Sequence, residues 1–215
     1  MTGDARYNPA IHHRRSIRLQ GYDYSQAGAY FITICTHIRE CLFGEIKDRE
    51  MQTNDAGKMV HTVWNDIPFR FDGLELDIFI VMPSHIHGII VLPWRRGESC
   101  IRPSPTTDHS TDHKEGDHKD RPYGTLPGTV GRIVQAFKSI STRGYTVGVK
   151  KSGWSPFQGK LWQRNYWEHI IRNETELNRT RAYIQDNPDQ WESDKLHPRG
   201  GERFSALMEI REPAA

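Results

Sequence analysis

The sequence predicts an α+β fold of the ferredoxin-like or RRM-like kind, a split βαβ sandwich with an antiparallel sheet. Three observations support this prediction: short β-branched runs, helical spacing of apolar residues between them, and a tight turn that joins two of the runs. The expected order is strand, helix, strand, strand, helix, strand, helix. The first six elements form the sheet with helices on one face, and the seventh is an added C-terminal helix. RNA-recognition modules share this fold, so the fold alone does not decide the function.

The first half of the chain supplies four of these elements. Residues 30–36 are β-branched and aromatic, which is typical of a strand. In residues 54–69, apolar side chains recur at helical spacing, which predicts a helix. Residues 74–81 and 85–92 are predicted strands, and the short turn 82–84 between them predicts a hairpin.

The second half supplies the other three elements. An apolar stripe predicts a helix over residues 130–145, and residues 159–163 (GKLWQ) are predicted to form the fourth strand. The last predicted helix begins at Asn173, which serves as its N-cap with Glu176 three residues later. It ends at Asn187, because the proline that follows disfavours helical geometry in the residue before it.

Length and composition predict a single domain over residues 1–194 and a C-terminal tail over 195–215. Residues 95–124 contain three prolines and almost no large apolar side chain, which predicts a disordered or lid-like insertion. The apolar runs are too short for a membrane span or a signal peptide, so we expect a cytoplasmic protein with no membrane role. Three cysteines without a CxxC pair argue against a disulfide framework and a cysteine zinc site.

Basic residues are concentrated in two parts of the chain, although the net charge is only +2. Residues 128–183 contain ten lysines and arginines against three acidic residues, and residues 1–19 contain four arginines against one aspartate. This distribution suits a polyphosphate partner. Ordinary solvated surface is the alternative, and charge alone does not decide between them.

Two histidines in the third predicted strand are the most specific local feature. Side chains alternate across a strand, so His85 and His87 share one face and Ile86 lies on the other. Imidazoles about 6–7 Å apart along one face can reach one divalent metal ion. The alternative is that both histidines are exposed on the strand and have no function. The neighbouring residues are apolar, however, and buried histidines need a partner, which favours a metal site.

Tyr183 and Asn187 form a second pair, on the last predicted helix. At a spacing of four residues they lie on one face, one turn apart. Taken singly, the tyrosine is typical of the edge of a core and the asparagine of a turn before proline. Together with the histidines they suit phosphodiester transesterification. The phenol would be the nucleophile, and a metal held by two imidazoles and an amide oxygen would stabilise charge on the phosphate.

Four segments resemble the REP-associated tyrosine transposases of the HUH single-tyrosine transposase superfamily. They are RRSIRLQGYDYSQAGAYFITICTH (14–37), VMPSHIHGIIVLP (81–93), GRIVQAFKSIST (131–142) and LWQRNYWEHIIRNETELNRTRAYIQDNP (161–188). They occur in matching order over most of the expected folded chain, whereas the insertion is not part of the shared pattern.

The resemblance implies the role of each site residue. His85 and His87 correspond to the metal-binding pair, Tyr183 to the catalytic nucleophile and Asn187 to the third metal ligand. Related transposases carry glutamine four residues after the tyrosine, so Asn187 departs from that wider pattern although it suits the REP-associated branch. The implied cofactor is Mg²⁺ or Mn²⁺.

The resemblance also implies the substrate: single-stranded DNA with short hairpins, as in REP elements, cleaved to a 5′-phosphotyrosine and a free 3′-hydroxyl. We expect a monomer or a homodimer. Candidate contacts to the DNA backbone are Arg14, Arg15, Arg18, Lys138, Arg143, Arg164 and Arg172.

Two alternatives remain at this point. Tyr166 and His169, three residues apart, are a rival nucleophile and ligand. A non-catalytic RRM-like protein that binds single-stranded nucleic acid is the rival function, with Tyr30 and Phe31 as its stacking aromatics. A stacking platform has no use for the histidine pair, so that pair discriminates between the two functions.

Overall fold

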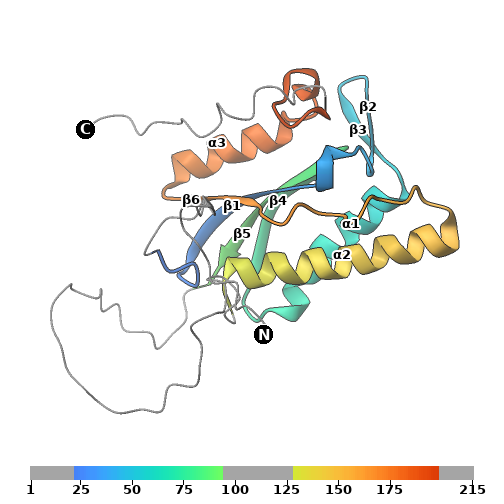
Figure 1. Ribbon diagram of the computed structural model, residues 1–215. Helices are drawn as coiled ribbons and strands as arrows, with labels where there is room; N and C mark the ends of the chain where they lie inside the picture. Colours follow the sequence, from blue (N-terminus) through green and yellow to red (C-terminus); the bar gives the residue numbers. More distant parts are fainter. Residues whose placement is uncertain (1–21, 94–127, 199–215) are drawn as a thin grey trace, which may run out of the picture.

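A computed structural model describes residues 22–93 and 128–198 of the chain. Its centre is a four-stranded antiparallel sheet with the order β4-β5-β1-β6 (Figure 1). Each strand pairs antiparallel with its neighbours, and the last strand lies beside the first. This topology confirms the ferredoxin-like prediction. The strands are β1 (Gly28–Cys35), β4 (Glu75–Val81), β5 (His85–Leu92) and β6 (Trp167–Ile171).

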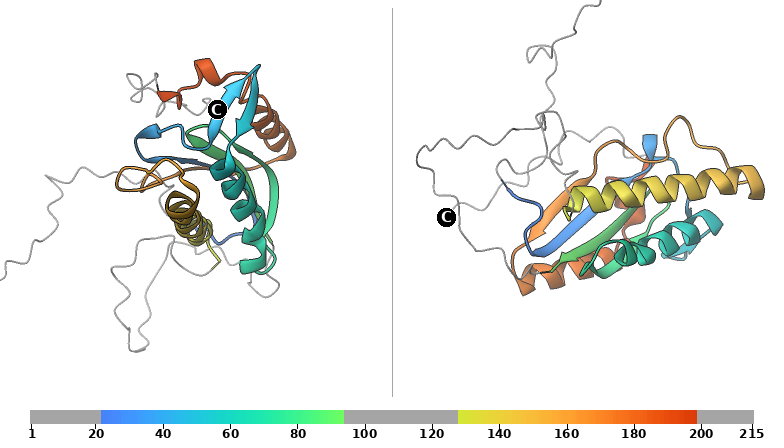
Figure 2. Two further views of the ribbon diagram at one scale, coloured as in Figure 1. Left: turned by 90° about the vertical axis from the view of Figure 1, so that its right-hand side faces the viewer. Right: turned by 90° about the horizontal axis from the view of Figure 1, so that it is seen from below.

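Helices cover both faces of this sheet. The helices α1 (Asp55–Asp66) and α2 (Val130–Ser152) pack on one face, and α3 (Glu174–Gln185) packs on the opposite face (Figures 1 and 2). The side chain of Asn54 caps α1 and that of Asn173 caps α3, as the latter's sequence predicts. We refer below to the helix-pair face and the α3 face of the sheet.

Alternation along the strands gives the two faces different contents. The larger core lies on the helix-pair face and includes Tyr30, Ile32 and Ile86. A smaller cluster on the α3 face contains Phe31, Ile89, Ile171 and Ile184. On the helix-pair face, Trp64 of α1 packs so closely on Gly88 that a Cβ there would lie 2.6 Å from the indole. Glycine in this strand therefore makes room for a core tryptophan.

The predicted strand at residues 159–163 is wrong, because the fourth strand is β6, Trp167–Ile171. Leu161 and Trp162 are apolar because they fill the core: both are buried, and the Trp162 Nε1–H donates to Ser141 Oγ at 2.8 Å. In the predicted stretch, Trp162 forms an isolated bridge with Thr36. Burial in an irregular segment thus gave the same pattern as a strand.

Other element boundaries also differ from the predictions. The helix predicted to end at residue 145 continues to Ser152, where Gly153 adopts the left-handed conformation that terminates helices. The last helix ends at Gln185, two residues before the predicted end. A hairpin of β2 (Gly44–Lys47) and β3 (Glu50–Thr53), which the sequence did not predict, precedes α1.

Several predictions concern residues outside the described part of the chain. The insertion at 95–124 and the arginines Arg14, Arg15 and Arg18 lie there, as does most of the tail from residue 195. Within residues 22–93 and 128–198, none of the helices is long and apolar enough to cross a membrane.

Candidate metal centre and tyrosine

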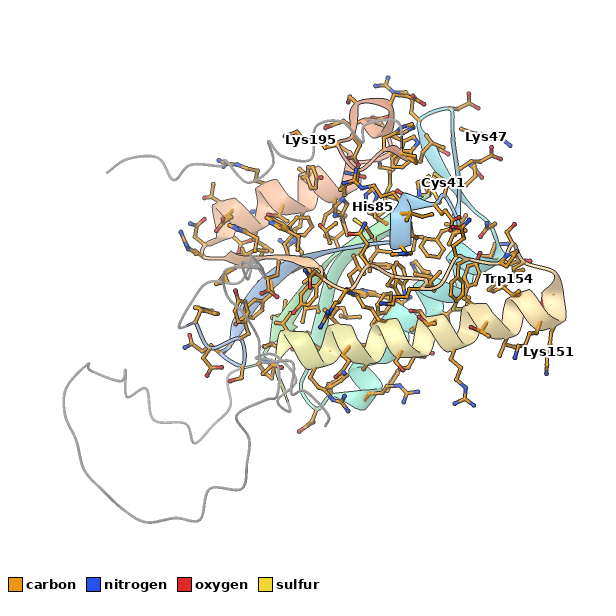
Figure 3. All side chains as sticks on the ribbon, viewed as in Figure 1. Cys41, Lys47, His85, Lys151, Trp154 and Lys195 are labelled. Atoms are coloured by element: carbon orange, nitrogen blue, oxygen red, sulfur yellow. The ribbon has the colours of Figure 1, made fainter. Side chains whose placement is uncertain are left out.

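The side chains of the two histidines of β5 lie on the α3 face of the sheet and point towards each other. Both His85 and His87 are buried, and their Nε2 atoms lie 3.1 Å apart. The intervening Ile86 belongs to the core on the helix-pair face, so the predicted shared face is confirmed. In Figure 3, His85 lies inside the molecule, towards the segment that carries Lys195.

Neighbouring hydroxyl groups orient these imidazoles. Thr33, directly opposite His87 on β1, places its Oγ1 2.8 Å from His87 Nδ1. Ser84 Oγ lies 3.5 Å from His85 Nδ1. These contacts occupy the Nδ1 side of each ring and leave the two Nε2 atoms facing each other. Partners of this kind fix the tautomer and direction of metal-binding histidines.

Burial keeps both histidines neutral. It lowers the pKa of His87 to about 3 and holds the pKa of His85 well below its usual value. Repulsion from His87 lowers the pKa of His85 further. The neutral imidazole is the form that binds metal ions, so both rings are ready to act as ligands at neutral pH.

Asp194 brings a carboxylate to the same point, which the sequence did not predict. Its Oδ2 lies 3.6 Å from His85 Nε2, and it forms with the two histidines a compact group of ligand atoms. The segment after α3 places it: Trp191 packs against His85 with ring centroids 5.9 Å apart, and the Asp194 amide donates to Trp191 O. No spacing to the histidines in the sequence signals this role.

Asn187 adds a fourth candidate ligand next to the histidines, an amide oxygen. Its side chain is buried, and Oδ1 has no hydrogen-bond partner among the described residues. Interaction with this amide raises the pKa of His85 and lowers the pKa of Tyr183. Asn187 therefore interacts with both His85 and Tyr183, from a position just past the end of α3.

Tyr183 lies beside the histidines and remains open to solvent. Its ring centroid is 5.4 Å from that of His87 and 5.9 Å from that of Phe31, and the residue is 41% exposed. Partial burial and the nearby charge of Asp194 raise its pKa to about 12, against the opposing effect of Asn187. The free protein thus holds a neutral phenol next to the histidine pair.

These groups fit a divalent metal ion. Two neutral imidazoles, a carboxylate and an amide oxygen form a mixed nitrogen and oxygen donor set that suits several divalent ions. Asp194 Oδ2 and Asn187 Oδ1 are buried without hydrogen-bond partners among the described residues. Such atoms are costly in a folded protein, and coordination to a cation would satisfy both.

The rival pair, Tyr166 and His169, lies elsewhere. Tyr166 packs against the core of the helix-pair face, with the Lys138 ammonium 5.4 Å from its ring centre. His169 is on the α3 face, but its Nε2 lies 2.5 Å from Glu176 Oε1. The structure therefore does not bring these two residues together with His85 and His87.

The predicted DNA-contacting residues of the described chain fall into two groups. The Lys138 ammonium donates to the backbone oxygens of Gln163 and Asn165 at 2.9 and 3.0 Å, so it fastens α2 to the segment before β6. The other three are exposed and available to a ligand: Arg143, Arg164 and Arg172.

Comparison with known proteins gives a relative and two structural neighbours. A protein of Haemophilus influenzae, described as uncharacterized, is 42% identical over 192 residues, which cover 89% of this chain and 97% of that protein. No family model matches the sequence. The structure of a REP-associated tyrosine transposase bound to a REP hairpin is similar at TM-score 0.49 and 18% identity, covering 81% of this chain and 74% of that one. A candidate transposase from Deinococcus radiodurans has TM-score 0.40 and 17% identity, covering 80% and 97%.

Proposed function

We propose that this chain, which belongs to the same protein family as the Haemophilus influenzae protein, is a metal-dependent endonuclease and strand transferase that acts on single-stranded DNA. In this proposal, Tyr183 is the nucleophile, and His85, His87 and Asn187 hold the metal ion with the help of Asp194. One observation carries the proposal: an exposed tyrosine lies against a buried histidine pair, next to which two buried oxygens, Asn187 Oδ1 and Asp194 Oδ2, have no hydrogen-bond partner among the described residues.

The reaction follows from the chemistry of these groups. The Tyr183 phenol oxygen forms a bond to phosphorus, and the bond between phosphorus and the 3′-oxygen breaks. The products are a 5′-phosphotyrosine and a free 3′-hydroxyl: the phenol proton passes to solvent, and the leaving 3′-oxygen takes up a proton from solvent. The phosphotyrosine link keeps the energy of the phosphodiester, so a second 3′-hydroxyl can attack it and rejoin the DNA.

Each side chain has a defined part in this scheme. A bound divalent ion would place its positive charge next to the non-bridging phosphate oxygens and stabilise their negative charge. Thr33 and Ser84 keep the Nε2 atoms of the histidines directed at the ligand site. Asn187 contacts both His85 and Tyr183, so it couples the position of the nucleophile to that of the metal site.

The substrate in this proposal is hairpin-forming DNA of the REP type. The sequence resemblance supports it, as does the charge of the chain: residues 128–167 contain seven lysines and arginines and no acidic residue. Binding of phosphates by such a basic segment depends on charge and not on the base sequence of the DNA. We propose Mg²⁺ or Mn²⁺ as the cofactor, because carboxylate and amide oxygens suit both ions and a mixed nitrogen and oxygen site tolerates several divalent ions. We propose a monomer or homodimer as the active species.

The burial of two aromatic side chains argues against a purely binding RRM-like function. Tyr30 is fully buried on the helix-pair face, and its hydroxyl donates to Gln26 O at 2.7 Å. Phe31 is buried on the α3 face, beneath Tyr183. An RRM binds RNA on an open sheet face, whereas helices cover both faces of this sheet.

The proposal is tested by incubating labelled hairpin DNA with single-stranded flanks and the protein, with and without Mn²⁺ or Mg²⁺. We expect a cleaved strand and a protein–DNA adduct that survives denaturing electrophoresis, only when metal is present. Tyr166→Phe is the matched control for Tyr183→Phe, because each removes one hydroxyl. Cleavage without metal, or by the Tyr183→Phe protein, would contradict the proposal.

A further inference from the structure

An exposed tryptophan stands at the edge of the sheet beside the candidate site. Trp167 begins β6, the edge strand, and its cross-strand partner Thr33 pairs in turn with His87. Trp167, Thr33 and His87 therefore form one row across the α3 face. Two strand spacings put the Trp167 backbone on the order of 10 Å from that of His87. Trp167 is nevertheless 45% exposed, which is unusual for a large aromatic side chain in a strand.

The surrounding residues hold this indole in place. Trp167 meets the Phe31 ring edge-on at 5.3 Å, and the same Phe31 ring contacts Tyr183 at 5.9 Å. On its other side, Trp167 is stacked with His169, at 5.8 Å and an interplanar angle of 5°. His169 is itself fixed by Glu176, whose Oε2 also accepts the Arg172 amide at 2.7 Å. The indole is therefore part of a rigid aromatic row that leads to the tyrosine.

We propose that Trp167 stacks on a nucleobase of the single-stranded DNA next to the phosphate that Tyr183 attacks. The inference rests on the proposed function and names a contact that positions its substrate. Exposed aromatic rings flanked by cations are the usual means of binding single-stranded DNA, because every base has a face that can stack. Arg164 precedes β6 and Arg172 follows it, and both are exposed where the adjoining phosphates would run.

The opposite face of the same strand does not offer such a surface. Ile170 packs against the core of the helix-pair face, and Glu168 pairs with Ile32 of that core. The acidic neighbour on the Trp167 side, Glu176, is engaged by His169 and by the Arg172 amide, and these bonds hold its pKa below the usual value. Among the described residues of β6, the exposed aromatic ring thus lies on the same side of the sheet as the tyrosine.

The test measures DNA affinity in the Tyr183→Phe background without metal, so that it does not depend on cleavage. The probe is a short DNA hairpin with single-stranded flanks, together with copies in which each flanking nucleotide in turn is abasic. We expect Trp167→Ala to weaken binding of the intact probe about tenfold or more, and Trp167→Phe to weaken it less than about threefold. Phe69→Ala is the control, since Phe69 is 89% exposed and lies outside the site.

One abasic position should remove the difference in DNA affinity between the Trp167→Ala protein and its parent, the Tyr183→Phe protein. That position identifies the stacked base. Equal affinities of the Trp167→Ala, Phe69→Ala and parent proteins for every probe would overturn the inference. Trp167→Ala converting a dimer to a monomer in sedimentation, with unchanged DNA affinity, would also overturn it. If stacking is found but the active protein forms no adduct, the proposed nuclease function fails while this contact stands.

Discussion

The two faces of the central sheet use the same strands for different purposes. On the helix-pair face, β1 and β5 contribute Tyr30, Ile32, Ile86 and Ile90, all fully buried in an apolar core. On the α3 face, the alternate residues of these strands include Thr33, His85 and His87, which are also buried but polar. One strand therefore supplies core packing and candidate ligands at successive positions.

This difference shows which face of the sheet carries the groups that reduce the stability of the fold. The helix-pair face is closed by large aromatic contacts, such as Trp64 stacked on Phe79 at 4.5 Å. The α3 face instead holds two buried oxygens, Asn187 Oδ1 and Asp194 Oδ2, that accept no hydrogen bond from the described residues, and two histidines whose charged forms are disfavoured. Unsatisfied buried polar groups reduce stability, and proteins keep them mainly where they bind something. Stability should therefore come from one face and activity from the other.

The largest expected effect is the loss of activity on replacing the histidines. The double variant His85→Ala, His87→Ala should show no detectable cleavage or Mn²⁺ binding, because both imidazole ligands are gone. Its circular dichroism spectrum and most of its DNA affinity should persist, since basic side chains contact the phosphates. Calorimetric titration with Mn²⁺ and a cleavage assay measure the two losses. Full cleavage by this variant would contradict the proposal that His85 and His87 bind the metal ion.

The opposite result is expected on the helix-pair face. Trp64→Ala should lower the free energy of unfolding by about 3–5 kcal/mol, because it empties the space beside Gly88 and Phe79. Protein that remains folded should still bind Mn²⁺. Urea denaturation measures the stability change, with the double histidine variant as the comparison. A smaller loss for Trp64→Ala than for the histidine variant would contradict the division between the faces.

A pH dependence should come from the α3 face. Burial lowers the pKa of His85 and His87, so the unfolded chain binds more protons than the folded protein once the pH falls below about 6.5. Their contribution to stability is complete above that pH and is lost as the pH falls towards their folded values. For His87 the loss should be about 1–2 kcal/mol between pH 6.5 and 5 in metal-free protein, and His85 should add to it in the same direction. Replacing both with glutamine should flatten this part of the profile in thermal melts.

Asp194 provides a smaller and more local test. Asp194→Asn should weaken Mn²⁺ binding at least about tenfold, because an amide is a poorer ligand than a carboxylate beside the histidines. It should also lower the pKa of Tyr183, which the Asp194 charge raises. Mn²⁺ titration and the spectroscopic titration of tyrosinate check the two effects. Unchanged metal affinity would mean that Asp194 packs beside the site without joining it.

The smallest stability effect is expected for the proposed nucleophile, Tyr183. Tyr183→Phe should change the free energy of unfolding by less than about 1–2 kcal/mol, since only a partly exposed hydroxyl is lost. The ring contacts with Phe31 and His87 should persist. Thermal unfolding of this variant beside Tyr166→Phe provides the comparison. A much larger loss would show that the hydroxyl is a structural contact.

The fold class, the shared face of His85 and His87 and the cap at Asn173 were predictable, because each depends on local periodicity or spacing. The position of β6 was not, since Leu161 and Trp162 are apolar for burial in an irregular segment, whereas Trp167–Ile171 mixes charged and apolar residues. Asp194 also escaped prediction. It reaches the histidines only through the fold of the segment after α3, which no spacing in the sequence encodes.

The central claim is that the tyrosine of α3, beside the histidine pair, attacks the DNA. The most direct measurement is to trap the covalent adduct formed with labelled hairpin DNA and Mn²⁺, digest the protein and identify the modified peptide by mass spectrometry. The account predicts that the nucleotide is attached to Tyr183. Attachment to Tyr166 would contradict it, as would an adduct formed equally well by the double histidine variant.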